Sequence, residues 1–339
     1  MQSKVRIGIN GFGRIGKMAF KLAIEKFSDK VEVVGINDLN TTQQAAQVLK
    51  YDSVYGKFNH DISFTDTALV VDGIEYPKFA EKEPEKLPWG KLNVDVVLEC
   101  TGVFTKKEAA SRHLASGAKT VIISAPAKGE DHVGTYVIGV NDDKHNSAQE
   151  PIISNASCTT NCITPVMKVL EDSFGIEKAM MSTIHAYTAD QVLVDGNHKD
   201  PRRARSAGLN IVPTTTGAAI ATSEAIPSLK GVFDGLSFRV PVPVGSLSDM
   251  TVLLKKNVTK EEVNNALIAA SQTPRMKGVL EVTNEPVVSS DIVGNPASSI
   301  VDLALTTVVG GNLVKVVAWY DNEFGYSNRL IEQAIEVGR

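Results

Sequence analysis

The feature that most constrains this chain is a glycine-rich turn near its N-terminus. Residues 4–10 form an apolar run that predicts a buried strand, and a helical pattern follows over residues 17–27. Between them, Gly11 allows a tight turn, Gly13 lets a pyrophosphate approach the backbone, and Gly16 lets the helix pack on the strand. The free N–H groups of the first helical turn then face the pyrophosphate. The complete turn reads Gly11-Phe12-Gly13-Arg14-Ile15-Gly16.

A second predicted strand and an acidic residue strengthen this interpretation. The strand covers residues 31–37, and Asp38 lies 22 residues after Gly16 (38 − 16), where a carboxylate accepts hydrogen bonds from the hydroxyls of an adenosine ribose. A carboxylate at this place repels the 2′-phosphate of NADP, and the two residues after it are neutral. The predicted cofactor is therefore NAD. The alternative is that Asp38 caps a helix predicted over residues 41–50.

The first half of the chain predicts a doubly wound parallel sheet, because short apolar strands alternate with helical segments. Further strands are expected at residues 94–99, 120–124 and 136–140. Thr101 and Ser124 come at strand ends, which form the edge where sheets of this kind bind ligands. The alternative for these two residues is ordinary loop chemistry.

Antiparallel pairing is predicted in two other places. Residues 62–79 alternate between apolar and polar side chains around a turn at Asp72-Gly73, which is typical of an antiparallel excursion from the parallel sheet. After residue 157, longer alternating runs backed by helices predict a mostly antiparallel sheet. The predicted class is therefore α/β, with a Rossmann doubly wound parallel sheet at the N-terminus and an α+β domain after it. The longer runs cover residues 232–242, 246–256 and 313–319.

A cysteine provides the clearest candidate for a reactive residue. Cys158 stands where a polar turn opens into the amphipathic run 163–174, at the start of a predicted helix. Partial positive charge on the unpaired N–H groups of a first helical turn lowers the pKa of a thiol and favours the thiolate. A free cysteine is otherwise among the most buried residue types and behaves as a small hydrophobic side chain. We predict that Cys158 is a nucleophile.

A histidine further along the chain supplies the matching partner. His185 lies 27 positions after Cys158 (185 − 158), within residues 181–188, which alternate like a strand leaving a sheet. A lone histidine is more often a hydrogen-bonded structural residue. A cysteine at a helix start with a histidine at a strand end nevertheless matches an activated nucleophile and its base.

Arginines and hydroxyl groups that suit phosphate gather downstream. The polar stretch 189–208 contains Arg203, and connections of this length are usually functional or interfacial. Thr216 and Gly217 end a run of threonines, and Arg239 stands in a predicted strand. The alternative for each is a solvated charge or a turn, because basic residues in loops often belong to salt-bridged surfaces.

The composition limits the class of protein. The length of 339 residues suggests about two domains, and 43% apolar residues suffice for large cores. A net charge of −4 argues against a general nucleic-acid binder, whose domain is usually basic. We find no apolar leader and no apolar stretch long enough to span a bilayer, and therefore expect a cytoplasmic protein without a membrane partner. The three cysteines lack the spacing of a zinc site, so we expect reduced thiols and no metal.

Taken together, these blocks resemble the phosphorylating glyceraldehyde-3-phosphate dehydrogenases, and the resemblance covers essentially the whole chain. Chance agreement at so many ordered blocks is negligible. Besides Asn10 and the glycine turn, the matching blocks are Leu49-Lys50-Tyr51-Asp52-Ser53, Ser154-Asn155-Ala156-Ser157-Cys158-Thr159-Thr160-Asn161-Cys162, His185-Ala186-Tyr187-Thr188, residues 213–219 and Trp319-Tyr320-Asp321-Asn322-Glu323.

The resemblance implies a glycolytic reaction, in which oxidation of D-glyceraldehyde 3-phosphate is coupled to formation of an acyl phosphate. Cys158 would add to the aldehyde to give a hemithioacetal, with His185 as the base. Hydride would then pass to NAD, leaving a thioester that inorganic phosphate attacks to release 1,3-bisphosphoglycerate. The backbone N–H of Cys158 and the imidazolium of His185 would stabilise the developing oxyanion.

The resemblance also assigns residues to binding sites. Inorganic phosphate would lie against Ser157, Thr159, Thr216 and Gly217. Thr188 and Arg239 would hold the phosphate of the substrate, with Arg203 nearby. The residues expected to bind the cofactor are Gly11, Phe12, Gly13, Arg14, Ile15, Gly16, Asp38, Lys82, Thr101, Ser124 and Asn322.

Domains and assembly follow from the same resemblance. Residues 1–157 would form the NAD-binding Rossmann domain, completed by the C-terminal helix 322–339, and residues 158–321 the catalytic domain. The long loop 189–208 would pack at the interface of a homotetramer. One departure bears on the cofactor, because Gly196-Asn197 stand where strictly NAD-dependent members usually have Leu-Pro, and this leaves use of NADP open.

Three other functions compete with this interpretation. An erythrose-4-phosphate dehydrogenase is a sister activity, which the threonines at Thr188 and Thr216 disfavour. A semialdehyde dehydrogenase of similar architecture acts on a substrate with carboxylate and amine groups rather than phosphate. A protein that keeps the fold only to bind RNA or a surface partner would be expected to have damaged chemistry, yet Cys158, His185 and Asp38 are all present.

Overall fold

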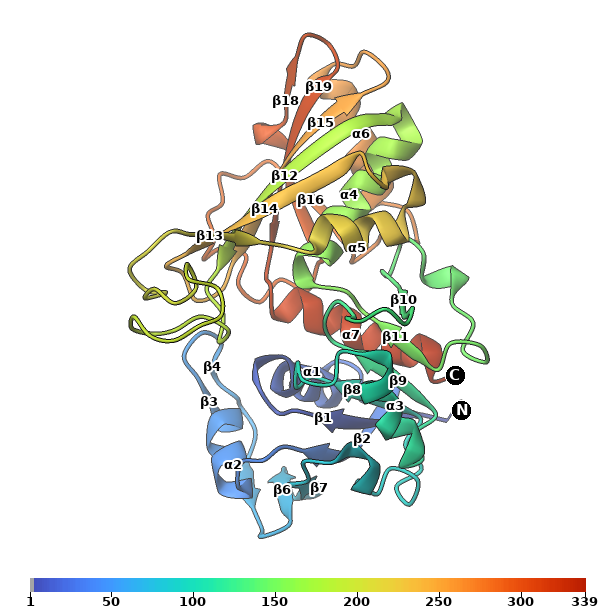
Figure 1. Cartoon of the computed structure of the whole chain (residues 1–339), viewed down its shortest axis with the longest axis vertical. Helices are drawn as coiled ribbons and strands as arrows, with labels where there is room; N and C mark the ends of the chain where they lie inside the picture. Colours follow the sequence, from blue (N-terminus) through green and yellow to red (C-terminus); the bar gives the residue numbers. More distant parts are fainter. Residues whose placement is uncertain (1–2) are drawn as a thin grey trace. The chain divides into compact units, whose positions relative to one another are not determined.

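The computed structural model describes residues 3–339, and the chain forms two compact units (Figure 1). The first unit runs to Tyr136 and takes in two later segments, Lys144–Ala156 and Ser327–Arg339. The second consists of Val137–Asp143 and Ser157–Tyr326. Each unit is therefore built from segments that are separated in the sequence.

The described residues of the first unit are built on a nine-stranded sheet with the order β10-β11-β9-β8-β1-β2-β7-β6-β5. Every pair from β10 to β7 is parallel, whereas β6 pairs antiparallel with both β7 and β5. Both the predicted parallel sheet and its antiparallel excursion are confirmed. The strands are β1 (Val5–Asn10), β2 (Val31–Asn37), β5 (Ile62–Phe64), β6 (Ala68–Val71), β7 (Ile74–Phe79), β8 (Val96–Glu99), β9 (Thr120–Ile123), β10 (Gly134–Thr135) and β11 (Ile152–Ser154).

The helices of this unit follow the strands as the pattern predicts. Helix α1 (Arg14–Glu25) begins within the glycine turn, and α3 (Lys107–Ala115) precedes β9. Helix α2 (Thr42–Lys50) follows β2 and leads into the hairpin β3 (Tyr51–Asp52) and β4 (Gly56–Lys57). The last helix, α7 (Phe324–Val337), begins in the second unit and ends in the first.

The strand expected at residues 136–140 is wrong. Only Gly134–Thr135 pairs there, as β10, and the following residues form turns in which the Val140 N–H donates to the Val137 carbonyl at 3.0 Å. Gly139 has a φ of +85°, which lies in the left-handed region and not in the extended range of a regular strand. Val137 and Val140 instead bury their side chains in the core of the second unit. Their apolar character therefore reflects that core and not an extended strand.

The second unit is a mixed, mostly antiparallel sheet against which α4 packs. Its order is β13-β14-β12-β15-β19-β17-β16, with β18 beside β19, and only the pairs β12–β14 and β16–β17 are parallel among the described residues. The strands are β12 (Ile176–Ala186), β13 (Val212–Thr215), β14 (Phe233–Val240), β15 (Ser246–Leu254), β16 (Leu280–Thr283), β17 (Ser299–Asp302), β18 (Thr307–Val309) and β19 (Leu313–Tyr320).

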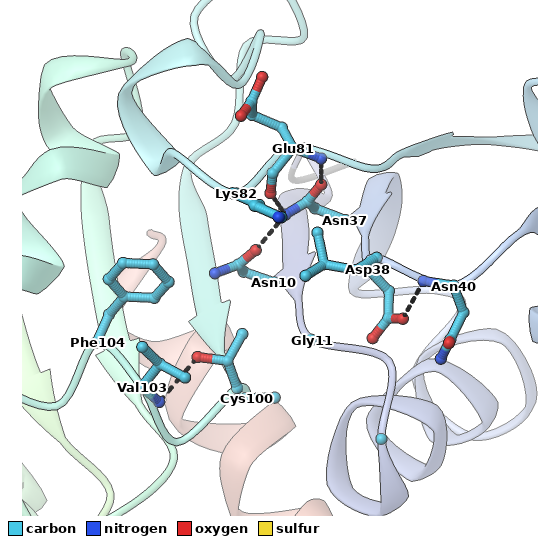
Figure 2. A pocket seen from close by; sticks show the side chains of 13 residues that line it. Asn10, Gly11, Asn37, Asp38, Asn40, Glu81, Lys82, Cys100, Val103 and Phe104 are labelled. Carbon is cyan, nitrogen blue, oxygen red and sulfur yellow. Dashed lines mark hydrogen bonds between the residues drawn. The ribbon is translucent and has the colours of Figure 1, made fainter.

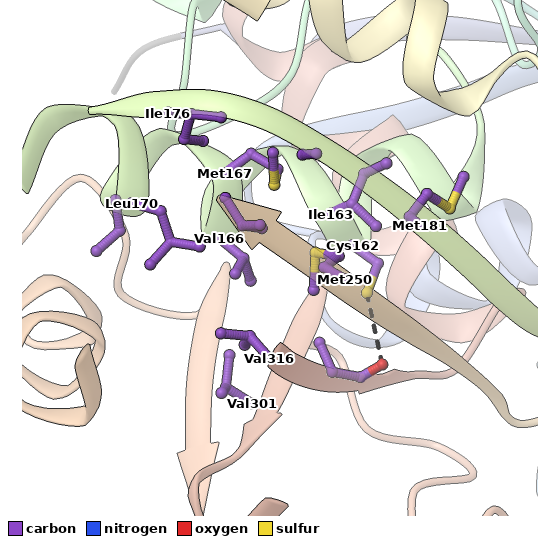
Figure 3. Packing of buried hydrophobic residues seen from close by; sticks show 14 of the residues in the cluster. Cys162, Ile163, Val166, Met167, Leu170, Ile176, Met181, Met250, Val301 and Val316 are labelled. Carbon is purple, nitrogen blue, oxygen red and sulfur yellow. Dashed lines mark hydrogen bonds between the residues drawn. The ribbon is translucent and has the colours of Figure 1, made fainter. Parts of the chain in front are cut away.

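One buried cluster joins the sheet of the second unit to its helices. These are α4 (Cys158–Phe174), α5 (Ala218–Ala225) and α6 (Lys260–Ser271). Figure 3 shows Ile163 and Met167 of α4 facing Met181 of β12 and Met250 of β15, all of them buried. This packing fixes the long α4 against the sheet, so the residue at its first turn is held rigidly. No helix within residues 3–339 is both long and apolar enough to cross a membrane.

Candidate active site

The glycine turn borders a cavity of about 410 Å³ in the first unit (Figure 2). Gly11 has a φ of +94°, and a Cβ there would lie 2.7 Å from the Thr101 nitrogen. At Gly16 a Cβ would come within 2.0 Å of the Gly11 carbonyl oxygen, whereas at Gly13 it would meet no atom within 4 Å. The first and third glycines therefore serve close packing, and the second leaves open space beside the backbone.

Asp38 lines this cavity and is held by the turn itself. Its Oδ2 accepts a hydrogen bond from the Phe12 N–H at 2.7 Å, and its Oδ1 accepts one from the Asn40 N–H at 3.0 Å. Helix α2 is capped instead by Thr41, in a capping box with Gln44. The alternative role of Asp38 as a helix cap is therefore wrong, and its carboxylate faces the ligand cavity.

Only some of the other residues predicted to bind the cofactor line this cavity. Lys82 and Thr101 line it, but Ser124 does not, and the Ser124 side chain instead bonds the Cys100 thiol. Arg14 forms an ion pair with Asp52, with Nη1 and Oδ2 2.6 Å apart. Of the remaining residues, Phe12 packs its buried ring on Phe20, Ile15 is half-buried in the first turn of α1, and Asn322 belongs to the second unit.

Cys158 is the first residue of α4 in the second unit, as predicted. The Ser157 hydroxyl caps this helix by accepting the Thr160 N–H at 3.0 Å. Just before the cap, Ala156 has a φ of +55°, an unusual value for a residue other than glycine, which costs about 1–3 kcal/mol. The chain therefore turns sharply to bring the cysteine to the N-terminus of the helix.

His185, on β12, faces this cysteine. Its Nε2 lies 3.3 Å from the Cys158 sulfur, and its Nδ1 lies 2.6 Å from the Ala186 carbonyl oxygen. A carbonyl only accepts, so Nδ1 carries the hydrogen and Nε2 presents a lone pair to the thiol. The predicted pairing of nucleophile and base is therefore present in the geometry.

The electrostatics of the pair differ in one respect from the prediction. Burial, assisted by the nearby Arg239 guanidinium, lowers the pKa of His185 to about 3, so its imidazole is neutral at physiological pH. Burial also raises the pKa of Cys158, although Arg239 and the Thr159 N–H act in the opposite direction. The expectation of a lowered thiol pKa from the helix N-terminus alone is wrong, because desolvation of the sulfur outweighs it. The thiol therefore depends on His185 to remove its proton.

A cationic group lies beside this pair. Nη1 of Arg239 donates to the Ala186 carbonyl at 3.2 Å and to the Thr188 hydroxyl at 3.1 Å. Its Nε is buried and has no hydrogen-bond partner among residues 3–339. A buried N–H without an acceptor is costly, and an anionic ligand would satisfy it.

Of the other residues predicted to bind phosphate, Thr216 and Gly217 lie at the start of α5, whereas Arg203 is already paired with a carboxylate. The Thr216 hydroxyl accepts the Ala218 N–H at 3.2 Å, and Gly217 is the N-cap of α5, with open space around its Cα. Arg203 instead forms an ion pair with Asp190, and its Nε donates to the Thr214 hydroxyl at 2.9 Å. The salt-bridged alternative weighed for the loop arginines therefore describes Arg203.

Comparison with known proteins finds matches in both halves of the chain. The NAD binding domain of glyceraldehyde 3-phosphate dehydrogenase matches residues 5–107, and the C-terminal domain of the same enzyme matches residues 157–322. Glyceraldehyde-3-phosphate dehydrogenase 2 of Streptomyces avermitilis is 52% identical over 334 residues, covering 98% of both chains. Glyceraldehyde-3-phosphate dehydrogenase of Borreliella burgdorferi is 51% identical over 336 residues, covering 97% of this chain and 98% of the relative. The chain belongs to the glyceraldehyde-3-phosphate dehydrogenase family.

Membership of the glyceraldehyde-3-phosphate dehydrogenase family makes NAD the cofactor, because the matched N-terminal region is the NAD-binding domain of that family. The residues present fit this group. The cavity lies in that region, and it combines open space at Gly13 with the carboxylate of Asp38. A dinucleotide needs both a close backbone for its pyrophosphate and an acceptor for its ribose.

Two sets of contacts in this family member escaped sequence reasoning, although Asn322 itself was expected to bind the cofactor. The Tyr320 hydroxyl lies 2.8 Å from the hydroxyls of both Thr159 and Thr183, and its ring packs edge-on against His185. Asn322 accepts the Ser246 hydroxyl at 2.9 Å through its Oδ1. Tyr320 and Asn322 stand in one recognised block, but their partners come from α4, β12 and β15, which only the fold brings to the end of β19.

Proposed function

We propose that this chain catalyses the reversible oxidative phosphorylation of D-glyceraldehyde 3-phosphate, with NAD and inorganic phosphate, to 1,3-bisphosphoglycerate and NADH. The observation that carries the proposal is the 3.3 Å approach of the Cys158 sulfur to the unprotonated Nε2 of His185. Relatives with this enzyme's name match nearly the whole chain, which supports the same substrate class.

The first steps are carried out by these two side chains. His185 Nε2 takes the thiol proton while the Cys158 sulfur bonds to the aldehyde carbon, and the carbonyl oxygen then recovers that proton to give a hemithioacetal. His185 next removes the hydroxyl proton as the C–H bond breaks. Bound NAD supplies the chemistry of hydride acceptance. A thioester on Cys158 remains, with His185 protonated.

Inorganic phosphate completes the reaction. Its oxygen attacks the thioester carbon, the C–S bond breaks, and the released sulfur takes its proton from His185. The Cys158 N–H, at the first turn of α4, and the imidazolium of His185 are placed to stabilise the oxyanion. Both residues then return to their starting protonation states.

We assign phosphate groups to two sets of residues. The substrate phosphate binds Arg239 and Thr188, which already bond each other, and the buried Arg239 Nε supports this assignment. Inorganic phosphate binds near the N-termini of α4 and α5, where N–H groups and hydroxyls are available. Its proposed ligands are Ser157, Thr159, Thr216 and Gly217, and Arg203 contributes positive charge nearby.

Most of the proposed cofactor contacts come from the first unit, whereas Asn322 belongs to the second. Asp38 binds the adenosine ribose, the backbone of the glycine turn binds the pyrophosphate, and Lys82 and Thr101 border the adenosine. Asn322 holds the nicotinamide carboxamide, with its orientation fixed by Ser246. The other proposed contacts come from Arg14, Ile15 and Ser124.

Several further properties belong to the proposal. The first unit acts as the NAD-binding domain and the second as the catalytic domain, and the observed units meet at residues 156 and 157 rather than at the expected 157 and 158, with Val137–Asp143 also in the second unit. The protein acts in the cytoplasm as a homotetramer in which loop 189–208 is covered. Exposed apolar side chains in that loop support this, since Leu193 is 83% exposed and Val194 is 72% exposed.

Steady-state assays of NAD reduction test the reaction directly. The purified protein is mixed with glyceraldehyde 3-phosphate, with and without inorganic phosphate, and in parallel with NADP. We expect rapid turnover that needs phosphate and prefers NAD, while the NADP assay measures what Gly196-Asn197 allow. Turnover with erythrose 4-phosphate but not with the triose would replace the proposal by the sister activity. No turnover with either sugar would contradict both enzymatic assignments.

A further inference from the structure

A buried carboxylate lies beneath the cofactor cavity and has no part in the proposed reaction. Glu99 is the last residue of β8 and is 1% exposed. Its Oε2 accepts from Asn10 Nδ2 at 2.5 Å and lies 3.0 Å from His113 Nε2. Its Oε1 accepts from the Thr101 N–H at 2.8 Å and from the Thr101 hydroxyl. Four hydrogen-bonding groups therefore converge on one side chain.

His113 is fixed as a donor to this carboxylate. The indole N–H of Trp89 lies 3.0 Å from His113 Nδ1, and an indole nitrogen only donates. Nδ1 must therefore accept, so the hydrogen of the neutral imidazole is on Nε2, facing Glu99. Trp89 and His113 are both completely buried. All four groups around Glu99 are consequently donors, which matches a carboxylate that only accepts.

The contacts of Glu99 extend into the walls of the cavity. Asn10 lines the cavity, and its Oδ1 accepts from Asn37 Nδ2 at 2.7 Å. Asn37 in turn bonds both the N–H and the carbonyl of Glu81, each at 2.9 Å (Figure 2). On the other wall, the Thr101 hydroxyl accepts the Val103 N–H at 3.0 Å. Glu99 thus joins the ends of β1, β2 and β8 and two lining loops.

We propose that Glu99 is a positioning residue for NAD, which sets cofactor affinity by holding the cavity walls in their bound arrangement. The inference rests on the proposed use of NAD in this cavity. A site whose walls are already ordered loses less conformational entropy when its ligand binds. Glu99 acts through Asn10 and Thr101, and Trp89 acts through His113.

Replacement of Glu99 by glutamine, Glu99→Gln, tests this directly. The shape is kept, but in either orientation the amide N–H₂ faces a donor, which is Asn10 Nδ2 with His113 Nε2 on one side and the Thr101 N–H on the other. We expect the Kd for NAD, measured by calorimetry, to rise about tenfold or more, as mispaired buried groups do. The kcat at saturating NAD and the KM for glyceraldehyde 3-phosphate should stay within about twofold of the unaltered protein. Glu108→Gln, exposed on α3, is the matched control for charge.

A second substitution separates this role from general destabilisation. In the double variant Glu99→Gln with Trp89→Phe, His113 Nδ1 is free to carry the hydrogen, so Nε2 can accept from the glutamine amide. We expect the double variant to bind NAD more tightly than Glu99→Gln alone. A merely structural role predicts the reverse, since a second buried side chain is truncated.

The outcomes distinguish this inference from the proposed function. If the unaltered protein does not bind NAD, the proposed function itself fails. If it binds NAD and Glu99→Gln binds equally well, only the role of Glu99 is overturned. Should Glu99→Gln not fold, Trp89→Phe, which does not line the cavity, removes the N–H that fixes His113 as a donor to Glu99. Weaker NAD binding by that variant supports the proposal, and unchanged binding overturns it.

Discussion

Two buried histidines, one in each unit, are held as opposite tautomers of the neutral imidazole. His185 is 4% exposed and donates through Nδ1 to a backbone carbonyl, which leaves Nε2 to accept from Cys158. His113 is fully buried and accepts at Nδ1 from Trp89, which leaves Nε2 to donate to Glu99. The same side chain is therefore a base in one place and a donor in the other.

The difference shows that the hydrogen-bond partner of Nδ1 decides whether Nε2 accepts or donates. A carbonyl at Nδ1 leaves Nε2 as a base, and an indole N–H at Nδ1 leaves Nε2 as a donor. Burial alone does not separate the two roles, because both rings are nearly inaccessible. It follows that changes at the two histidines should affect different kinetic parameters.

The largest effect is expected from removing the partner of His185. Cys158→Ser keeps the size of the side chain but replaces a good nucleophile and leaving group by a poor one, so kcat should fall by about 10³-fold or more. Folding and NAD binding should persist, as judged by calorimetry. Cys162→Ser, one turn further along α4, is the control and should keep its activity. Retained turnover in Cys158→Ser would remove that residue from its assigned role.

The next effect compares the two histidines directly. His185→Asn removes the base and should lower kcat by about 10²–10⁴-fold, the range for general base catalysis. His113→Asn should instead raise the KM for NAD while kcat at saturation changes little. Measuring kcat and both KM values for each variant tests the separation. A large fall in kcat for His113→Asn would contradict the division of roles.

A smaller effect on NAD binding is expected from Trp89, which donates a hydrogen bond to His113. Trp89→Phe removes the N–H that fixes the tautomer of His113, so both tautomers of this imidazole become accessible. The Kd for NAD should therefore rise by a few-fold, which corresponds to about the free energy of one hydrogen bond. Titration of NAD by calorimetry measures this change. Trp319→Phe, in the second unit, is the matched control and should leave the Kd unchanged.

The smallest effect concerns a third histidine, His60, which is partly exposed and lies between two carboxylates. The Asp72 carboxylate, together with that of Glu25, accepts hydrogen bonds from the ring of His60 and so raises its pKa above the ordinary value of 6.5. The raised pKa means that its contribution to stability is complete below pH 6.5 and is lost as pH rises through the raised value. Urea unfolding should therefore show a slight decrease in stability over that window. His60→Gln should abolish this decrease, and an unchanged slope in the variant would contradict the assignment.

Much of the fold and the site could be predicted from local patterns. The strand and glycine turn ending at Gly16 predicted β1, the cavity edge and α1, because turn geometry depends on a few neighbouring residues. Cys158 and His185 were found from their places at a helix start and a strand end. Residues 136–140 were misjudged, since an apolar run does not reveal which core receives it.

The sequence by itself determined the order of elements, the glycine turn, the acidic residue Asp38 and the two reacting side chains, because each depends on chemistry between near neighbours. Only the tertiary structure decided the raised pKa of Cys158 and the tautomers of His185 and His113. These depend on burial and on hydrogen-bond partners that other strands and loops supply. No local pattern shows that Trp89 lies behind His113, since 24 positions separate them in the chain.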